Sequence, residues 1–194
     1  MKSINIYLKL KNTGKTIFRI QDIKTLTGIE KYEYLKIYIN RMTKKNLIRP
    51  IINGVYYVAD TPPTDFEIAN NLCTPSYISL ESALVYYGII NQVPYTITSV
   101  TAKKAKTYNV DGKEYSYNHI KPTLFYPDLS KRDILIASRE KAIIDTIYLA
   151  SFSGENINFD EWELSDVDIN KLKTMANTIE ITTFSNLFYS LFKW

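Results

Sequence analysis

Hydrophobic and polar positions follow a helical period in the segment from Lys31 to Asn46. The segment reads KYEYLKIYINRMTKKN, and its apolar residues recur at spacings of four and three, which places them on one face of a helix: Leu35, Ile39 and Met42. A shorter amphipathic segment, Gln21 to Leu26, precedes it, and Gly28 lies between the two. Two helices joined by a tight turn that contains glycine are typical of a helix-turn-helix.

Two β-rich runs follow the second helix. They are Leu47 to Ile51 and Val55 to Ala59, and Asn53-Gly54 lies between them. Asn-Gly between such runs is a strong signal for a β-hairpin. Thr16 to Ile20 is a further short strand, which could pair with the hairpin as a third strand. The order of helix, turn, basic helix and hairpin predicts a winged helix-turn-helix.

The segment from Ile4 to Leu10 fits two structures. Apolar residues at every second position would suit a strand, but Ile4, Tyr7 and Leu8 also share one face of a helix. We predict a helix with that face buried, because a winged domain normally begins with one.

A pair of prolines, Pro62-Pro63, interrupts the pattern after the hairpin. Two successive prolines can neither continue a strand nor enter the interior of a helix. We therefore predict a first domain of residues 1–60 and a second domain of residues 61–194.

The second domain mixes predicted helices with predicted strands. Helices are expected over 65–72, 80–87, 139–150, 169–177 and 184–192, of which the first three are capped by Thr64, Ser79 and Ser138. Strands are expected over 95–101, 106–110, 113–117 and 134–137, with Asp111-Gly112 as a second hairpin turn. The chain is therefore expected to be α+β, with a small antiparallel sheet in its second domain.

Charge is distributed unevenly between the two predicted domains. Residues 1–60 hold 12 Lys and Arg against 4 Asp and Glu, whereas residues 61–194 hold 12 against 16. A strongly basic domain on an acidic remainder points to nucleic acid as the partner of the basic part. The alternative is a compositional bias of an AT-rich genome, which the many Tyr, Ile, Asn and Lys residues would also fit.

The basic helix offers two kinds of DNA contact. Asn pairs with adenine and Lys with guanine in the major groove, so the candidates for base contacts are Lys31, Tyr32, Lys36 and Asn40. Other basic residues would hold phosphates and supply salt-dependent affinity: Arg41, Lys44, Lys45 and Arg49. Asn53 at the hairpin tip is a candidate for contact with the DNA backbone or the minor groove. Ile37 could contact a thymine methyl or pack against the second domain, and each of the other side chains could instead be a solvated surface residue.

The residues give little support to an enzyme. Gly14-Lys15-Thr16 ends like a phosphate-binding loop but lacks the glycine expected five residues earlier. His119 is the single histidine. Pro127-Asp128 and Glu140-Lys141 resemble a nuclease pattern, but the Glu and Lys are adjacent rather than one residue apart, which spoils the metal-ligand geometry. We expect no catalytic residue, no metal and no cofactor.

The expected compartment is the cytoplasm. No run of about 18 apolar residues could span a membrane, and the N-terminus lacks the continuous apolar segment of a signal peptide. Cys73, the single cysteine, cannot form an internal disulfide, and no Cys/His metal spacing exists.

Two surfaces of the second domain could bind a partner. Lys103, Lys104 and Lys106 precede a hairpin that carries Tyr108, Tyr115 and Tyr117, and basic residues beside aromatic platforms can hold single-stranded nucleic acid or an acidic partner. The acidic stretch from 155 to 168 could contact a basic partner. Alternatively, the lysine group is only an exposed loop on a tyrosine-rich sheet, and the acidic stretch is only a solvated face.

Three blocks of the sequence together resemble the AbiEi-type antitoxins. They are PSYISLESALVYYGII, YTITSVTAKKAKTYNVDGKEYSYNHIKP and IASREKAIIDTIYLAS, and the hairpin LIRPIINGVYYVA is similar to that of the family's winged head. The resemblance covers roughly residues 18–151.

The resemblance implies a bifunctional protein of a phage-defence pair. The winged head would repress its own operon by binding inverted repeats in promoter DNA. The second domain, with the head, would counter a nucleotidyltransferase-like AbiEii toxin in a type IV system, in which direct contact with the toxin is not the accepted mechanism. We choose Lys103, Lys104, Lys106 and Tyr108 as the antitoxin surface. The alternative function is a winged-helix transcriptional regulator whose second domain senses a ligand or dimerises.

Overall fold

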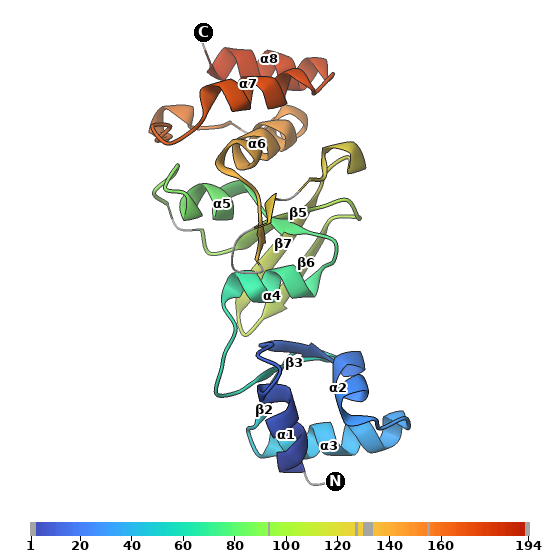
Figure 1. The fold of residues 1–194 in the computed structure, drawn as a ribbon. Helices are drawn as coiled ribbons and strands as arrows, with labels where there is room; N and C mark the ends of the chain where they lie inside the picture. The colour runs from blue at the N-terminus through green and yellow to red at the C-terminus, as the bar shows by residue number, and fades with distance from the viewer. Residues whose placement is uncertain (1–2, 93, 127, 130–133, 155, 193–194) are drawn as a thin grey trace. The chain divides into compact units, whose positions relative to one another are not determined.

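The computed structural model describes residues 3–92, 94–126, 128–129, 134–154 and 156–192 (Figure 1). The chain divides into two compact units, Met1–Leu72 and Cys73–Trp194. No helix among the described residues is long and apolar enough to cross a membrane.

The first unit contains four helices and three strands in its described part. In chain order they are α1 (Ser3–Lys11), β1 (Ile17–Arg19), α2 (Ile20–Thr27), α3 (Tyr32–Lys44), β2 (Ile48–Ile52), β3 (Val55–Val58) and α4 (Asp65–Leu72). The strands form one antiparallel sheet in the order β1-β3-β2. The predicted helices, hairpin and third strand are thus confirmed, including a helix rather than a strand at the N-terminus.

The core of the first unit is formed by one face of each of its first three helices and by the sheet. The buried residues are Ile6 and Leu10 of α1, Ile23 of α2, Leu35, Ile39 and Met42 of α3, and Phe18, Ile48 and Val58 of the strands. The predicted inner face of α1 was wrong, because Ile4 and Leu8 are 45% and 48% exposed. In a helix, Ile6 and Leu10 lie on a different face from Ile4 and Leu8, and only one face can meet the core.

Gly28 ends α2 and allows the chain to enter α3. Its φ of 67° lies in the left-handed region that favours glycine, and its N–H donates to the carbonyl oxygen of Lys24 at 3.0 Å. The turn between the two helices therefore depends on the residue that the sequence pattern marked.

Hydrogen bonds join α4 to β1 within the first unit. The Thr16 hydroxyl donates to Glu67 at 2.9 Å, and the Arg19 guanidinium donates to the carbonyl oxygen of Asn71 at 2.8 Å. The division between the units accordingly follows Leu72, whereas the prolines predicted a boundary after Asp60. The prolines do end the strand pattern, but the chain after them returns to the first unit.

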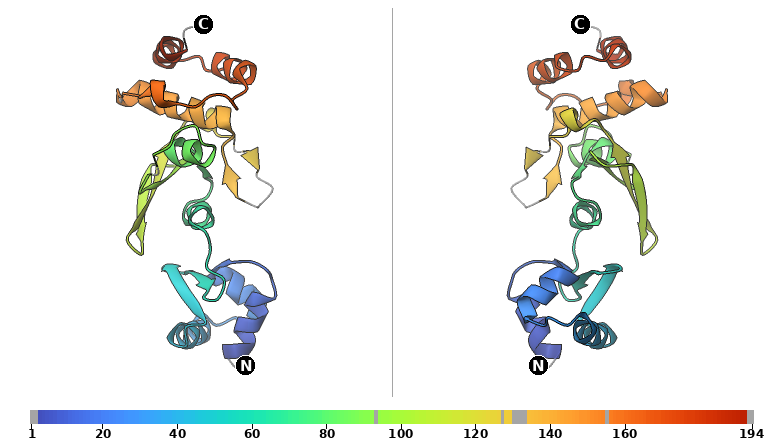
Figure 2. Two further views of the ribbon diagram at one scale, coloured as in Figure 1. Left: turned by 90° about the vertical axis from the view of Figure 1, so that its left-hand side faces the viewer. Right: turned by 90° about the vertical axis from the view of Figure 1, so that its right-hand side faces the viewer.

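In its described residues the second unit contains six short strands, four α-helices and two 3-10 turns, and α6 is the longest helix. The strands are β4 (Tyr77–Ile78), β5 (Ile97–Thr101), β6 (Lys106–Val110), β7 (Lys113–His119), β8 (Asp128–Leu129) and β9 (Leu135–Ile136). The helices are α5 (Leu80–Tyr86), α6 (Arg139–Ser153), α7 (Ile169–Asn177) and α8 (Thr182–Leu191), with 3-10 turns η1 (Pro122–Leu124) and η2 (Phe159–Glu161). Figures 1 and 2 show α6 between α5 on one side and α7 and α8 on the other.

The sheet of the second unit is mixed, so the prediction of an antiparallel sheet was wrong there. The strand order is β6-β7-β5-β4-β9-β8, and both the β5–β7 and β4–β9 pairs are parallel. The predicted hairpin of β6 and β7 is present, and Asp111 and Gly112 in its turn both have positive φ. However, β7 returns between β6 and β5, and this insertion makes β5 and β7 neighbours that run in the same direction.

A buried ion pair lies within α6. Lys141 and Asp145 are each 2% exposed at the side chain and form a salt bridge one turn apart. Asp145 also accepts hydrogen bonds from the Tyr77 hydroxyl at 3.0 Å and the Ser79 hydroxyl at 2.8 Å. Burial lowers the pKa of Lys141 and raises that of Asp145, while their mutual attraction opposes both shifts. The cluster connects α6 to β4 and to the start of α5.

Two predicted helix caps have different outcomes. Ser138 caps α6, where its hydroxyl oxygen accepts from the N–H of Lys141 at 3.2 Å. Ser79 precedes α5 in extended backbone but makes no cap hydrogen bond, so that prediction was wrong. Its hydroxyl donates instead to the Asp145 carboxylate, a charged acceptor that forms a stronger bond than a neutral one.

We predict that Lys141→Met destabilises the second unit by about 3–5 kcal/mol, because it leaves the charge of Asp145 buried without its partner. Urea unfolding followed by tryptophan fluorescence would measure this, since both tryptophans of the sequence, Trp162 and Trp194, lie in that unit. The double variant Lys141→Met/Asp145→Leu should recover most of the loss. The control Lys104→Met, at an exposed position, should change stability by less than about 0.5 kcal/mol. Equal effects of Lys141→Met and Lys104→Met would contradict the prediction.

We also predict that Glu67 makes the stability of α4 depend on pH. Burial raises the pKa of Glu67, but hydrogen bonds from Thr64 and Thr16 outweigh it and hold this pKa below the ordinary value. The stabilisation is therefore present above the unfolded-state pKa and is lost as the pH falls through the folded-state pKa. Glu67→Gln should weaken hydrogen-exchange protection of the α4 amides at neutral pH, and the difference from the unmodified protein should shrink in acid. Glu33→Gln, at an exposed position, is the control; a difference that persists unchanged in acid would contradict the role of the charge.

Candidate nucleic-acid interface

The packing of α3 determines which of its residues meet solvent. Leu35, Ile39 and Met42 are at most 3% exposed, so the opposite face of the helix points outward. All the α3 and hairpin residues that the sequence nominated for DNA contact are exposed: Lys31, Tyr32, Lys36, Asn40, Arg41, Lys44, Lys45, Arg49 and Asn53. The structure thus presents this set to solvent from one helix and the adjoining hairpin.

Aromatic rings hold two of the ammonium groups at the N-terminal half of α3. The Nζ of Lys36 lies 4.6 Å from the centre of the Tyr32 ring, and the Nζ of Lys31 lies 5.9 Å from that of Tyr34. Such cation–π contacts restrict a lysine side chain without neutralising its charge. Tyr34, which is 56% exposed, is a candidate that the sequence reasoning missed. Its signal was an aromatic residue at an outward helical position three residues after a lysine.

Asn40 and Ile37 lie on the same exposed side of the helix. Asn40 is exposed and carries an amide that could pair with adenine. Ile37 is 45% exposed, which is unusual for a large aliphatic side chain in the middle of a helix. Its position is compatible with the predicted contact to a thymine methyl group.

The C-terminal half of α3 and the start of β2 carry a denser group of cations. Arg41, Lys44 and Lys45 lie in the last turn and at the C-cap, where positive charge also favours the helix dipole. Arg49 of β2 is oriented by Asn46, whose side-chain oxygen accepts from the Arg49 Nε at 2.9 Å. These four side chains have the exposure and charge that phosphate contacts require.

The hairpin packs against two helices of the first unit, α2 and α3. The N–H of Ile20 at the start of α2 donates to the carbonyl oxygen of Gly54 at 2.9 Å, beside the exposed Asn53. On β3, Val58 shares a core with Leu35, Ile39 and Met42 of α3. Burial, and after it the charge of the nearby Tyr32, raises the pKa of Tyr56 on the same strand. The hairpin and α3 therefore form one surface rather than two independent ones.

The lysine group of the second unit is less open than the sequence indicated. Lys103, Lys104 and Lys106 are exposed, but the Lys103 ammonium donates to the carbonyl oxygen of Thr74. The Nζ of Lys106 lies 4.4 Å from the centre of the Tyr108 ring, which is partly exposed. Tyr115 and Tyr117 are 2% and 1% exposed, so the prediction that they serve as surface platforms was wrong. Both belong to the core, because they alternate inward along β7.

The residues considered for catalysis are held by other groups. The carbonyl oxygen of Lys103 lies 2.8 Å from Nδ1 of His119, and Glu140 forms an ion pair of 3.0 Å with Lys171. Pro127 and the side chain of Asp128 lie outside the described residues, as does Glu155 of the acidic stretch. Across the described ranges, no group of three His, Cys, Asp or Glu residues is placed to hold a metal ion.

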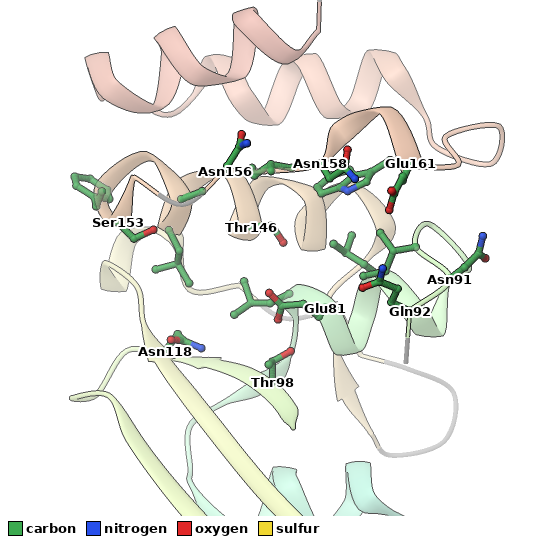
Figure 3. Close-up of a pocket in the computed structure, with 18 residues that line it drawn as sticks. Glu81, Asn91, Gln92, Thr98, Asn118, Thr146, Ser153, Asn156, Asn158 and Glu161 are labelled. Carbon is green, nitrogen blue, oxygen red and sulfur yellow. The ribbon is translucent and has the colours of Figure 1, made fainter. Parts of the chain in front are cut away.

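The second unit contains a cavity of about 1140 Å³ (Figure 3). Its walls come from α5, α6, β5, β7 and the segment around η2. Polar lining residues include Glu81, Thr98, Asn118, Thr146 and Glu161. Sequence reasoning did not find this cavity, because its lining residues come from five separate segments and share no motif.

Comparisons with known proteins do not assign the chain to a group. No protein-family model matches the chain, and no curated protein matches it either.

We predict that the substitution Arg41→Ala/Lys44→Ala/Lys45→Ala weakens binding to duplex DNA of any sequence. It should also reduce the slope of log K against log salt by about 2 to 3, since each phosphate contact contributes roughly 0.9. Fluorescence anisotropy with a labelled duplex at several salt concentrations would measure both effects. The matched control is Lys103→Ala/Lys104→Ala/Lys106→Ala, which removes the same charge from the other unit and should leave the slope unchanged. An equal loss of slope in both variants would contradict the assignment of phosphate contacts to α3.

Proposed function

We propose that this protein is a non-enzymatic cytoplasmic antitoxin that represses its own operon by binding promoter DNA through its first unit. The observation that carries the DNA-binding part is the exposed basic face of α3 next to the β2–β3 hairpin. The order of helix, strand, helix, helix, strand and strand is that of a winged helix-turn-helix. In such domains the second helix of the motif enters the major groove.

Each part of this surface has a role in the proposal. Lys31, Tyr32, Lys36 and Asn40 reach base edges, with Tyr34 and Ile37 adding apolar contact. Arg41, Lys44, Lys45 and Arg49 hold phosphates, which positions the helix without reading sequence. Asn53 at the hairpin tip reaches the backbone or the minor groove of the adjoining turn. The excess of positive charge over the first sixty residues supports this division, because it supplies the sequence-independent part of the affinity.

Antitoxicity is assigned to the second unit on the resemblance of its sequence blocks to the AbiEi-type antitoxins. Those blocks contain β4 and α5, the β5–β7 strands and most of α6, which all belong to the second unit. In the proposed antitoxin surface, Lys103, Lys104 and Lys106 are exposed and Tyr108 is partly exposed, and the Lys103 ammonium donates to the carbonyl oxygen of Thr74. The partner in this proposal is a nucleotidyltransferase-like toxin, countered with or without direct contact.

A second candidate function is a winged-helix transcriptional regulator whose second unit senses a small molecule. The cavity in that unit favours it, because a space of about 1140 Å³ with both polar and apolar walls is of the size that small ligands occupy. Both candidates share the DNA-binding surface and differ in what the second unit does.

Co-expression with the neighbouring open reading frame separates the two candidates. If the neighbour arrests growth, the full chain should restore growth. The variant Arg41→Ala/Lys44→Ala/Lys45→Ala should lose repression of a promoter reporter. A neighbour that is harmless, or toxic and not countered, would overturn the antitoxin proposal and favour the regulator.

Asn40→Ala tests base readout apart from general affinity. It should reduce binding to the promoter duplex by about 1–3 kcal/mol, because one bidentate pair with adenine is lost. Binding to unrelated duplex DNA should stay the same. Competition binding with the two duplexes measures the ratio; a uniform loss on both would show that Asn40 does not read a base.

A further inference from the structure

The cavity of the second unit has a polar centre. Figure 3 shows Glu81, Thr98, Asn118 and Thr146 around its middle, while Asn156, Asn158 and Glu161 lie along the segment that borders it. Apolar walls surround this centre and are formed by Leu84, Ile90, Leu149, Phe152, Ile157 and Trp162. A site with a few convergent polar groups inside apolar walls is typical of small-molecule binding.

The two central hydroxyl groups can only accept further hydrogen bonds. The Thr98 hydroxyl donates to the carbonyl oxygen of Ser79 at 2.8 Å, and the Thr146 hydroxyl donates to that of Ala142 at 2.8 Å. A hydroxyl has one hydrogen to donate and two lone pairs. The Thr98 hydroxyl also accepts a hydrogen bond from the N–H of Ser82 at 3.0 Å, which leaves one lone pair for an occupant of the cavity. The hydrogen of the Thr146 hydroxyl is likewise committed to the protein backbone, so this group too can only accept from an occupant.

The charged residues that line the cavity are both acidic. Glu81 and Glu161 are the charged members of its described lining, and neither lysine nor arginine belongs to it. An ionised carboxylate also accepts hydrogen bonds and does not donate them. The carboxylates and the hydroxyls are therefore all hydrogen-bond acceptors. They favour a ligand that donates hydrogen bonds and carries positive charge.

We propose that this cavity binds a small organic cation, an amine whose ammonium group lies between Glu81, Thr98 and Thr146 and whose apolar body packs against the Leu84, Leu149 and Trp162 wall. An ammonium group has three donors and no acceptor, which matches the acceptors around the centre. Asn118 can orient towards the same group through its side-chain oxygen. The site is independent of the proposed DNA surface, so either one can fail without the other.

The test uses three probes that share one apolar body and differ in charge. Phenethylamine, phenethyl alcohol and phenylacetate would be titrated into the full-length protein by isothermal titration calorimetry. The amine should bind at least about tenfold more tightly than the alcohol, and phenylacetate should bind most weakly of the three. Tryptophan fluorescence provides a second signal, because Trp162 lines the cavity.

Glu81→Gln should weaken binding of the amine about tenfold while leaving that of the alcohol unchanged, since only the charge is removed. Glu161→Gln is the second test variant, and Glu180→Gln, exposed and outside the cavity lining, is the control. Circular dichroism would establish that each variant is folded. The proposal is overturned if the amine shows no binding at about 10 mM, if phenylacetate binds best, or if neither cavity variant differs from Glu180→Gln.

Discussion

The burial of one apolar stripe on α3 is the constraint on which the proposed DNA surface depends. Leu35, Ile39 and Met42 occupy the core of the first unit, together with residues of α1, α2 and the sheet. Burying three large side chains stabilises this unit by several kcal/mol, on the order of 1.5–3 kcal/mol for each. The helix cannot rotate without losing that burial, so its basic and amide-bearing face is fixed towards solvent. The stability of the unit and the proposed recognition of DNA thus use opposite faces of the same helix.

The packing of the second unit depends on a different interaction, a buried ion pair with its hydrogen-bond partners. Lys141 and Asp145 are hidden in α6, and Tyr77 and Ser79 complete the hydrogen bonds of the carboxylate. A buried pair stabilises only when its geometry satisfies both charges, which makes the cluster costly to disturb and specific in arrangement. It holds α6 against β4 and α5, and those same elements, α5 and α6, form two walls of the cavity. The relative position of these two walls therefore depends on an interaction whose residues lie outside the cavity lining.

Local patterns predicted the local structure well. The period of Leu35, Ile39 and Met42, Gly28 between two helices, and Asn53-Gly54 between two strands each specify a structure through backbone geometry that depends on neighbouring residues alone. Sheet topology was missed because it depends on contacts between strands that are distant in sequence. No local signal near β7 indicates that this strand lies between β6 and β5.

The face of α1 was missed because alternating apolar residues leave two helical faces almost equally apolar. Lys141 and Asp145 look like an ordinary surface pair at helical spacing, and only the burial of the face that carries them reveals their role. The candidate DNA residues could be nominated from charge and period, whereas the cavity, assembled from five segments, could not.

The central claim is that α3 and the hairpin form the DNA-binding surface, and chemical-shift mapping tests it most directly. An isotopically labelled full-length protein would be titrated with the duplex that lies upstream of its own gene, and amide shifts would be followed by heteronuclear NMR. The account predicts perturbations concentrated in residues 31–58, above all at Lys36, Asn40, Lys44 and Asn53. Perturbations centred on Lys103 to Lys106 instead, or none in the presence of saturating duplex, would contradict it.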